Sequence, residues 1–208
     1  MQDILVTIPF APDLDLGSAY NRTMAALPEG GWACLLDHDA TFTTKAWYFQ
    51  LQAAINFDPD GTYTCVTNRF YQVREAPGWQ ARYPYPDDHD LRNHRAFGKK
   101  QLVDTTVEDV TNSDHLARGL LILVSKKTWQ AVGGFPAPGL LGVDWGWHLR
   151  LRRYGKPYYC VNGLYLYHWY RADGDLSAFQ KAPYYDYRQE IPPDQVKCET
   201  TPLHLPAM

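Results

Sequence analysis

The sequence has little cysteine and no pattern that would pair it. Its four cysteines stand far apart, and no two of them form a C-x-x-C motif: Cys34, Cys65, Cys160 and Cys198. Zinc ribbons and small disulfide scaffolds need closely spaced or abundant cysteines. The sequence therefore predicts neither, and reduced thiols in a cytoplasmic protein are the expected state.

Long apolar runs and an excess of one charge are missing too. No stretch approaches the roughly 20 apolar residues of a membrane-spanning helix, and the N-terminus lacks the basic flank and apolar core of a signal peptide. Lys and Arg number 20 against 23 Asp and Glu, a formal net charge of -3. We therefore expect no transmembrane segment, with any membrane contact made from the surface. The bulk charge also argues against a dedicated nucleic-acid binder.

Apolar strand-like stretches alternate with helix-like stretches along the chain. Strands are expected at 4–10, 32–36, 62–71, 119–124 and 158–167. Helices are expected at 19–27 after Ser18, at 45–56 after Thr43 or Thr44, at 126–132 after Ser125, and at 145–154 before Gly155. This alternation predicts an α/β fold with a mainly parallel central sheet.

The length of 208 residues suits one domain with its own core. We expect that domain to span residues 1–170, and residues 171–208 to form a C-terminal tail that packs on it or is partly disordered. Residues 72–117 are polar, carry several prolines and show no sustained period. They are interpreted as an insertion that carries function.

Two acidic residues, Asp37 and Asp39, follow the apolar strand at 32–36 directly. In open α/β sheets, ligands bind beyond the carboxyl ends of the strands. Carboxylates in such a place need a partner, and a hard divalent cation that bridges them to phosphate oxygens is the simplest one. The alternative is that both are solvated loop residues. His38, between them, is expected to point away from both if the strand alternation continues.

A second motif begins at Gly133-Gly134-Phe135-Pro136 and continues through Asp144, an arginine-containing helix and Gly155. This segment resembles the catalytic C-terminal segment of inverting GT-A glycosyltransferases related to family two. There, a G-G-F turn precedes an E-D motif, a helix with arginine and a glycine. The first strand, an asparagine-containing helix and the D-x-D motif occur in the same order here, so the resemblance covers about residues 4–168, apart from the insertion.

The resemblance implies a single GT-A domain of the Rossmann-like nucleotide-diphospho-sugar transferase kind. It also implies an enzyme that moves a sugar from a nucleotide-diphosphate donor to an acceptor hydroxyl with inversion, and a UDP-sugar is the expected donor. The insertion would face the acceptor, which is a glycan, a lipid-linked sugar, a protein or a modified nucleic acid. Lys99 and Lys100 would bind the phosphates of a nucleic acid, although the negative charges of Asp87, Asp88 and Asp90 oppose such binding.

Site roles follow residue by residue from the resemblance. Asp39 would bind the metal directly, and Asp37 would bind the metal or hydroxyls of the donor. His168 would be a further ligand that favours Mn²⁺ over Mg²⁺, or else a hydrogen-bonded histidine. Asp144 would be the general base, although Val143 replaces the first acid of the E-D motif. A helix N-cap is the alternative role for Asp144.

The remaining residues implied at the donor are Pro9, Phe10, Arg69, Gly133, Gly134 and Trp145. Two other functions stay open. A sugar nucleotidyltransferase shares the fold and the metal chemistry, but residues 7–11 lack its glycine-rich basic loop. A non-catalytic relative that only binds a nucleotide sugar would fit Val143 and the short chain.

Overall fold

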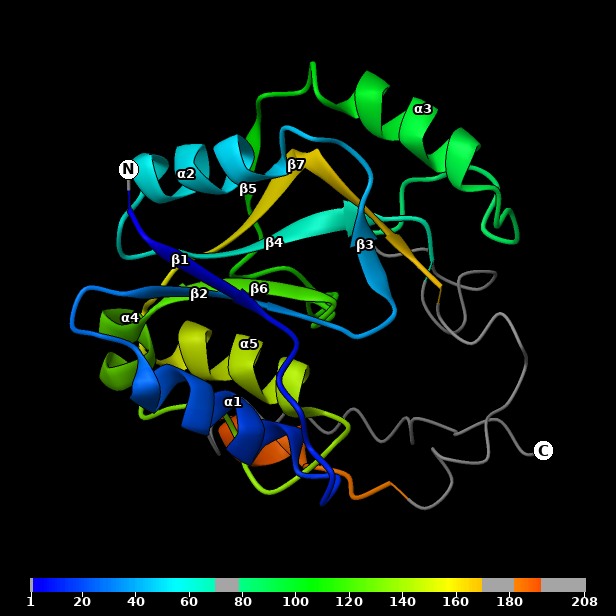
Figure 1. The fold of residues 1–208 in the computed structure, drawn as a ribbon. Coiled ribbons are helices and arrows are strands. Elements are labelled where there is room, and N and C mark those ends of the chain that lie inside the picture. The colour runs from blue at the N-terminus through cyan, green and yellow to red at the C-terminus, as the bar shows by residue number, and fades with distance from the viewer. Residues whose placement is uncertain (1, 70–78, 170–181, 192–208) are drawn as a thin grey trace.

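One mixed sheet between helices forms the centre of the molecule (Figure 1). The computed structural model describes residues 2–69, 79–169 and 182–191. The strands are β1 (Ile4–Thr7), β2 (Trp32–Leu36), β3 (Ala40–Phe42), β4 (Thr62–Thr67), β5 (Val107–Asp109), β6 (Leu121–Ser125) and β7 (Tyr158–His168). The helices are α1 (Leu16–Ala26), α2 (Trp47–Phe57), α3 (Leu91–Gln101), α4 (Lys126–Ala131), α5 (Val143–Arg153) and the short 3-10 helix η1 (Tyr187–Glu190).

The strand order is β1-β2-β6-β4-β7-β3, and β5 also pairs with β7. Only the β1–β2 and β4–β7 pairs are parallel, whereas β6 is antiparallel to β2 and to β4, and β3 and β5 are antiparallel to β7. The α/β class holds, but the expected mainly parallel pairing does not. Because β6 reverses direction between β2 and β4, the strands β1, β2, β4 and β7 still run the same way. Their carboxyl ends meet at one edge.

The sheet has a hydrophobic cluster on each face. Helices α1, α4 and α5 lie on one side, where Phe135 stacks on Trp147 at 4.1 Å and meets Tyr20 edge-on at 5.0 Å. Helix α2 covers the other side, and its Leu51 packs into a cluster with Leu123 of β6. Strands β2 and β6 are buried along their whole length, as expected of central strands covered on both faces.

Helix boundaries depend on their caps. Helix α1 begins at Leu16 rather than at the expected residue 19, because Oδ1 of Asp15 accepts a hydrogen bond from the backbone N of Ser18 at 3.0 Å. Asp15, not Ser18, is therefore the N-cap. Ser125 caps α4 as predicted, since its side chain accepts from the backbone N of Thr128.

Helix α2 starts without a side-chain cap. The N-cap is Ala46, and neither predicted threonine serves. Thr43 is buried, and its hydroxyl donates to the carbonyl of Tyr165 at 2.8 Å. Tertiary structure therefore uses Thr43 to join this loop to β7.

Regular structure within 72–117 is a correction to the sequence interpretation. Residues 79–117 contain α3 and β5, whereas 72–78 lie outside the described residues. Helix α3 is capped by Asp90 and buries only His94 and Gly98 fully, with Phe97 half-buried. Phe97 is the one large apolar side chain on this inner face, and most of the helix is charged or polar. The apolar content is therefore too low to mark a helix in the sequence, and the helix was missed.

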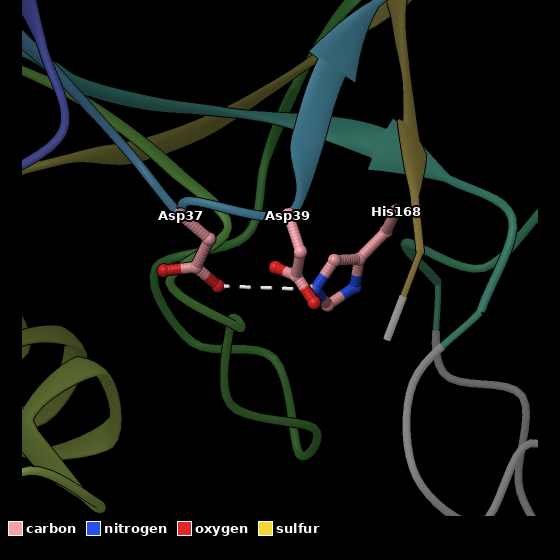
Figure 2. Close-up of side chains that lie close together, drawn as sticks. All are labelled: Asp37, Asp39 and His168. Atoms are coloured by element: carbon pink, nitrogen blue, oxygen red, sulfur yellow. Dashed lines mark ion pairs between the residues drawn. The ribbon is translucent and has the colours of Figure 1, made fainter. Parts of the chain in front are cut away.

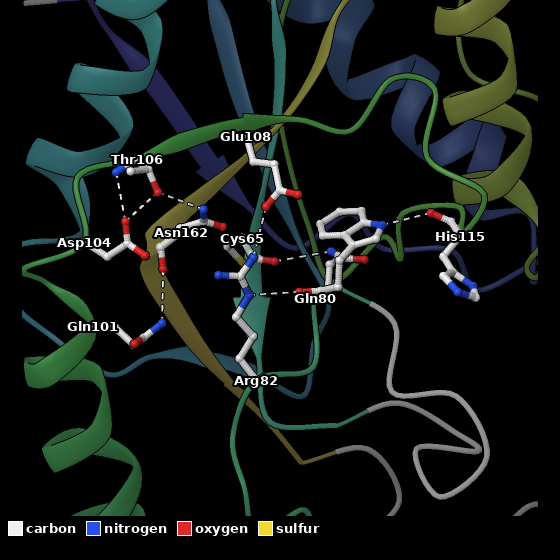
Figure 3. A network of polar contacts seen from close by, with 10 residues as sticks. Cys65, Gln80, Arg82, Gln101, Asp104, Thr106, Glu108, His115 and Asn162 are labelled. Carbon is white, nitrogen blue, oxygen red and sulfur yellow. Dashed lines mark hydrogen bonds and ion pairs between the residues drawn. The ribbon is translucent and has the colours of Figure 1, made fainter.

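Polar contacts join this segment to β4 and β7 (Figure 3). The amide of Gln80 donates to the carbonyl of Cys65 at 3.3 Å. The amide of Asn162 donates to Thr106 Oγ1 at 2.9 Å. An ion pair of 3.1 Å joins Arg82 to Glu108. The segment is therefore built into the sheet rather than hanging from it.

Within the tail, residues 182–191 pack against α5. Arg150 pairs with Glu190, and the backbone N of Tyr185 donates to the carbonyl of Leu141 at 2.8 Å. The rest of the predicted tail, 171–181 and 192–208, lies outside the described residues. In the part of the chain that the structure describes, no helix has the length and apolar character to cross a bilayer.

Candidate functional site

The shared carboxyl edge of the sheet gathers polar residues from three strands. Asp37 follows β2, Asn68 follows β4 and His168 ends β7. These strands run in one direction, so residues distant in sequence meet there. The close-up shows both aspartates and the imidazole side by side at this edge (Figure 2).

Asp37, Asp39 and His168 form a candidate metal centre. One ligand atom from each lies within 4.8 Å of the others. Nε2 of His168 is 3.2 Å from Oδ1 of Asp39 and 3.9 Å from Oδ2 of Asp37. Two carboxylates and one imidazole suit a divalent ion such as Mn²⁺. The structure thus brings together the three residues that the sequence proposed as ligands.

Strand β3 explains how Asp39 reaches His168. It pairs antiparallel with β7, with Ala40 opposite His168. The backbone N of Trp169 then donates to the carbonyl of Asp39 at 2.9 Å. His38 is exposed and does not belong to the metal group among the described residues. Its expected orientation away from the ligands is consistent with this.

Backbone contacts hold the imidazole of His168 in place. Asn68 is fully buried; its Oδ1 accepts from the backbone N of His168 at 2.7 Å, and its Nδ2 donates to the carbonyl of His168 at 3.0 Å. Nδ1 of His168 is 3.2 Å from the carbonyl oxygen of Arg69. A neutral His168 that donates Nδ1–H to this carbonyl keeps the lone pair of Nε2 toward the aspartates, the arrangement that metal-bound histidines use.

Charge in the group is uneven. Burial raises the pKa of Asp37 to about 6, and the neighbouring carboxylates Asp39 and Asp144 act in the same direction. The Asp37 side chain keeps 34% exposure, so solvent tempers this shift. Burial also disfavours the charged form of Asp39, but its hydrogen bond with His168 prevails and lowers the pKa of Asp39.

His168 shows the matching effect. Burial alone would lower the pKa of His168, but the hydrogen bond to Asp39 and the charges of both aspartates raise it. The aspartates thus favour the protonated form of His168, whose positive charge offsets part of their negative charge. A divalent cation would take over this task and displace the proton.

Asp144 lies in the first turn of α5 and is not its N-cap. That position belongs to Gly142, with a left-handed φ of 79°. Oδ2 of Asp144 accepts from the backbone N of Gly119 at 3.0 Å, and Oδ1 from that of Trp145 at 2.9 Å. Burial raises the pKa of Asp144, while the Arg118 charge and these N–H groups oppose the rise.

The loop before β6 links Asp144 to the metal group. Gly119, which donates to Asp144, precedes Leu120, whose carbonyl accepts from the backbone N of Asp37 at 3.1 Å. Two adjacent residues of one loop therefore hold Asp37 on one side and Asp144 on the other. A metal ligand and the proposed base belong to one connected site.

The other residues proposed at the donor divide into two groups. Pro9 and Phe10 follow β1 at the same edge as the metal group, and Phe10 is 80% exposed. Arg69 follows Asn68, and its guanidinium donates to the carbonyl of Trp169 at 2.8 Å and pairs with Asp87 at 3.6 Å. Trp145 adjoins Asp144. Pro9, Phe10 and Arg69 thus lie at the edge of the sheet that carries the metal group, and Trp145 follows the proposed base.

Gly133 and Gly134 are placed elsewhere. Both adopt positive φ, and their carbonyls accept from Nη1 of Arg150 at 3.4 and 2.8 Å. Arg150 lies in the last turns of α5, whereas Asp144 lies in the first. A Cβ on Gly134 would be 2.9 Å from Oδ1 of Asn21. The structure thus gives these glycines a role in a turn and does not bring them next to the aspartates.

Sequence reasoning missed the positioning role of Asn68, the presence of Arg118 near Asp144 and that of Tyr187 beside Trp145. Asn68 stands directly after a buried strand, just as Asp37 does, so the rule that selected Asp37 also predicts Asn68 at this edge. Arg118 and Tyr187 carry no local signal, because packing alone brings them to α5.

Comparison with known proteins adds no relative. No protein-family model matches the sequence, and no curated protein matches it at a significant level. The site's own geometry is therefore the basis for a function.

Proposed function

We propose that the protein is a metal-dependent glycosyltransferase that transfers a sugar from a nucleotide-diphosphate donor, a UDP-sugar in the first instance, to an acceptor hydroxyl with inversion. The observation that carries this proposal is the convergence of Asp37, Asp39 and His168 at the carboxyl edge of the sheet, with Asp144 held by the adjoining loop. Such a transfer requires a metal at the donor diphosphate and a general base at the acceptor hydroxyl within one site.

Asp39, His168 and Asp37 would hold the metal, with Mn²⁺ preferred because imidazole is one of the ligands. When bound, the cation neutralises charge on the departing diphosphate. Three protein ligands leave coordination positions for phosphate oxygens and water. The chain's own contribution is to orient the ligands, through Asn68 on the backbone of His168 and through β3 for Asp39.

Asp144 would accept the proton of the acceptor hydroxyl. Two backbone N–H groups fix its orientation. The raised pKa of Asp144 makes its carboxylate a stronger base. Val143 is buried and offers no second acid, so Asp144 serves alone.

A first experiment is a thermal-shift screen of nucleotide sugars with and without Mn²⁺, because a ligand that binds the folded state raises the midpoint of unfolding. Donor hydrolysis and transfer are then measured for the wild type, Asp39→Ala and Asp144→Asn. Asp60→Ala is the matched control, since Asp60 is a partly exposed carboxylate that pairs with Lys127 away from the site.

We expect a metal-dependent shift that Asp39→Ala removes and Asp144→Asn retains, with turnover lost in both. Metal-dependent binding by the wild type without turnover would favour a non-catalytic nucleotide-sugar binder. Formation of a nucleotide sugar from a sugar phosphate would favour a nucleotidyltransferase. Absence of any metal-dependent shift would refute the proposal.

A further inference from the structure

Aromatic residues of the C-terminal segment lie beside the proposed base. The ring of Tyr187 meets that of Trp145 edge-on, with centroids 4.9 Å apart and planes at 89°. Tyr184 lies next to Tyr187, with centroids 6.3 Å apart. Trp145 directly follows Asp144 in α5. Two segments distant in sequence thus assemble three rings at the start of α5, the turn that also carries Asp144. We name Trp145, Tyr184 and Tyr187 the aromatic wall.

Contacts of the neighbouring residues also hold the aromatic wall in place. Glu190 accepts a hydrogen bond from the hydroxyl of Tyr185 at 2.6 Å and pairs with Arg150. The carbonyl of Leu141 accepts from the backbone N of Tyr185. A Cβ on Gly142 would lie 2.5 Å from the carbonyl oxygen of Tyr185 and 3.2 Å from the ring of Tyr184. The rings are therefore positioned before any ligand arrives.

Exposure and charge limit what the wall can bind. Tyr184 is 51% exposed, and Tyr187 and Trp145 are half-buried. The guanidinium of Arg118 lies 4.3 Å from the centre of the Trp145 ring, close to the opposite charge of Asp144. Asp186 pairs with Arg188 at 2.6 Å. The charges here balance, so the surface does not favour a polyanion.

We infer that the aromatic wall binds the ring of an uncharged sugar and places one of its hydroxyls at Asp144. This inference rests on the proposed function, because it gives the acceptor its chemical class. Aromatic faces pack against the apolar C–H face of a pyranose, and the phenol hydroxyls hydrogen-bond to its edge. The acceptor is then a glycan, and the C-terminal segment supplies part of its binding site.

Saturation-transfer NMR with the full chain tests this, with UDP and the diamagnetic ion Mg²⁺ present. The probes are methyl β-D-glucopyranoside, methyl β-D-galactopyranoside and methyl 2-acetamido-2-deoxy-β-D-glucopyranoside. We expect at least one to bind, and Tyr184→Ala and Tyr187→Ala each to weaken binding roughly 3- to 10-fold. Tyr154→Ala is the control, because Tyr154 has a similar exposure of 52% but lies at the far end of α5.

Binding of no sugar in this panel, or unchanged binding in both variants at an unchanged midpoint of unfolding, would overturn the inference. The same holds if a single-stranded oligonucleotide binds in a manner that depends on the two tyrosines while the sugars do not. If Tyr187→Ala unfolds the protein, Tyr184→Ala still tests the inference, because about half of Tyr184 is exposed. Thermal shifts with Mn²⁺ and UDP are recorded separately. If Mn²⁺ and UDP do not raise the midpoint of unfolding but a sugar still binds, the proposed function is refuted, whereas sugar binding at the aromatic wall stands.

Discussion

Nε2 of His168 lies 3.2 Å from Oδ1 of Asp39, although Asp39 lies in the turn before β3 and His168 ends β7, far along the chain. The contact exists because β3 turns back after Asp39 and pairs with the end of β7. It also sets the charge state of the site, since the pair lowers the pKa of Asp39 and raises that of His168.

Asp37→Asn should remove metal binding while leaving the metal-free protein at least as stable at pH 7.5. Burial raises the pKa of Asp37 to about 6 from 3.8. A group whose pKa is higher in the folded state stabilises that state at pH values below its unfolded-state pKa. This contribution is lost as the pH rises through the folded-state pKa. At pH 7.5 the ionised carboxylate is thus a cost that asparagine avoids. Calorimetric titration should show Mn²⁺ affinity reduced at least roughly tenfold, and a lower metal-free midpoint would contradict the charge argument.

Asn68→Ala should weaken Mn²⁺ binding by roughly 10- to 100-fold, because Asn68 holds both backbone groups of His168. Loss of general stability is separated from loss of positioning by a double-mutant cycle with His168→Ala. If Asn68 acts through His168, the double variant binds Mn²⁺ no more weakly than His168→Ala alone. Additive losses would show that Asn68 acts independently.

The protein should lose stability as pH falls from about 6.5 to 4, and His148 should cause part of that loss. His148 is fully buried; its Nδ1 accepts from the backbone N of Ala117, and its Nε2 donates to the carbonyl of Thr111. Burial lowers the pKa of His148 to about 4. Between about pH 6.5 and 4 this histidine is therefore protonated in the unfolded chain but not in the folded one. The difference lowers the free energy of unfolding by about 3 kcal/mol.

Urea unfolding of wild type and His148→Gln at pH 7 and pH 4.5 measures this contribution. The variant should be less stable at pH 7 but should change less between the two pH values. An equal change in both proteins would show that carboxyl groups account for the whole acid effect.

Glu190→Ala should destabilise the protein by about 3 kcal/mol and reduce sugar binding at the aromatic wall. The Glu190 side chain is 6% exposed and pairs with Arg150, which would be left with an uncompensated charge. Arg188→Ala is the matched control, because its pair with Asp186 is largely exposed and should contribute less than about 1 kcal/mol. Equal midpoints for the two variants would contradict the anchoring role of Glu190.

Local patterns in the sequence were enough for much of the candidate site. The apolar run before Asp37 predicted β2 at its observed bounds, and Ser125 predicted the start of α4. Both depend on interactions within a few residues: burial of consecutive side chains, and a hydroxyl that accepts from a backbone N–H nearby. The acidic motif was selected by its position after this strand, whereas His168 and Asp144 were selected through the family resemblance.

Tertiary structure alone decided how these pieces meet. Nothing local predicts that β6 inserts antiparallel between β2 and β4, that β3 pairs with β7, or that the residues of η1 pack on α5 beside Asp144. The strand pairings join distant segments through backbone hydrogen bonds that nearly every residue type can make, so side-chain patterns do not encode them. The packing of η1 on α5 depends on side chains that only the folded chain brings together. The sequence by itself determined which residues can hold a metal or take a proton, and long-range packing decided which of them share a site.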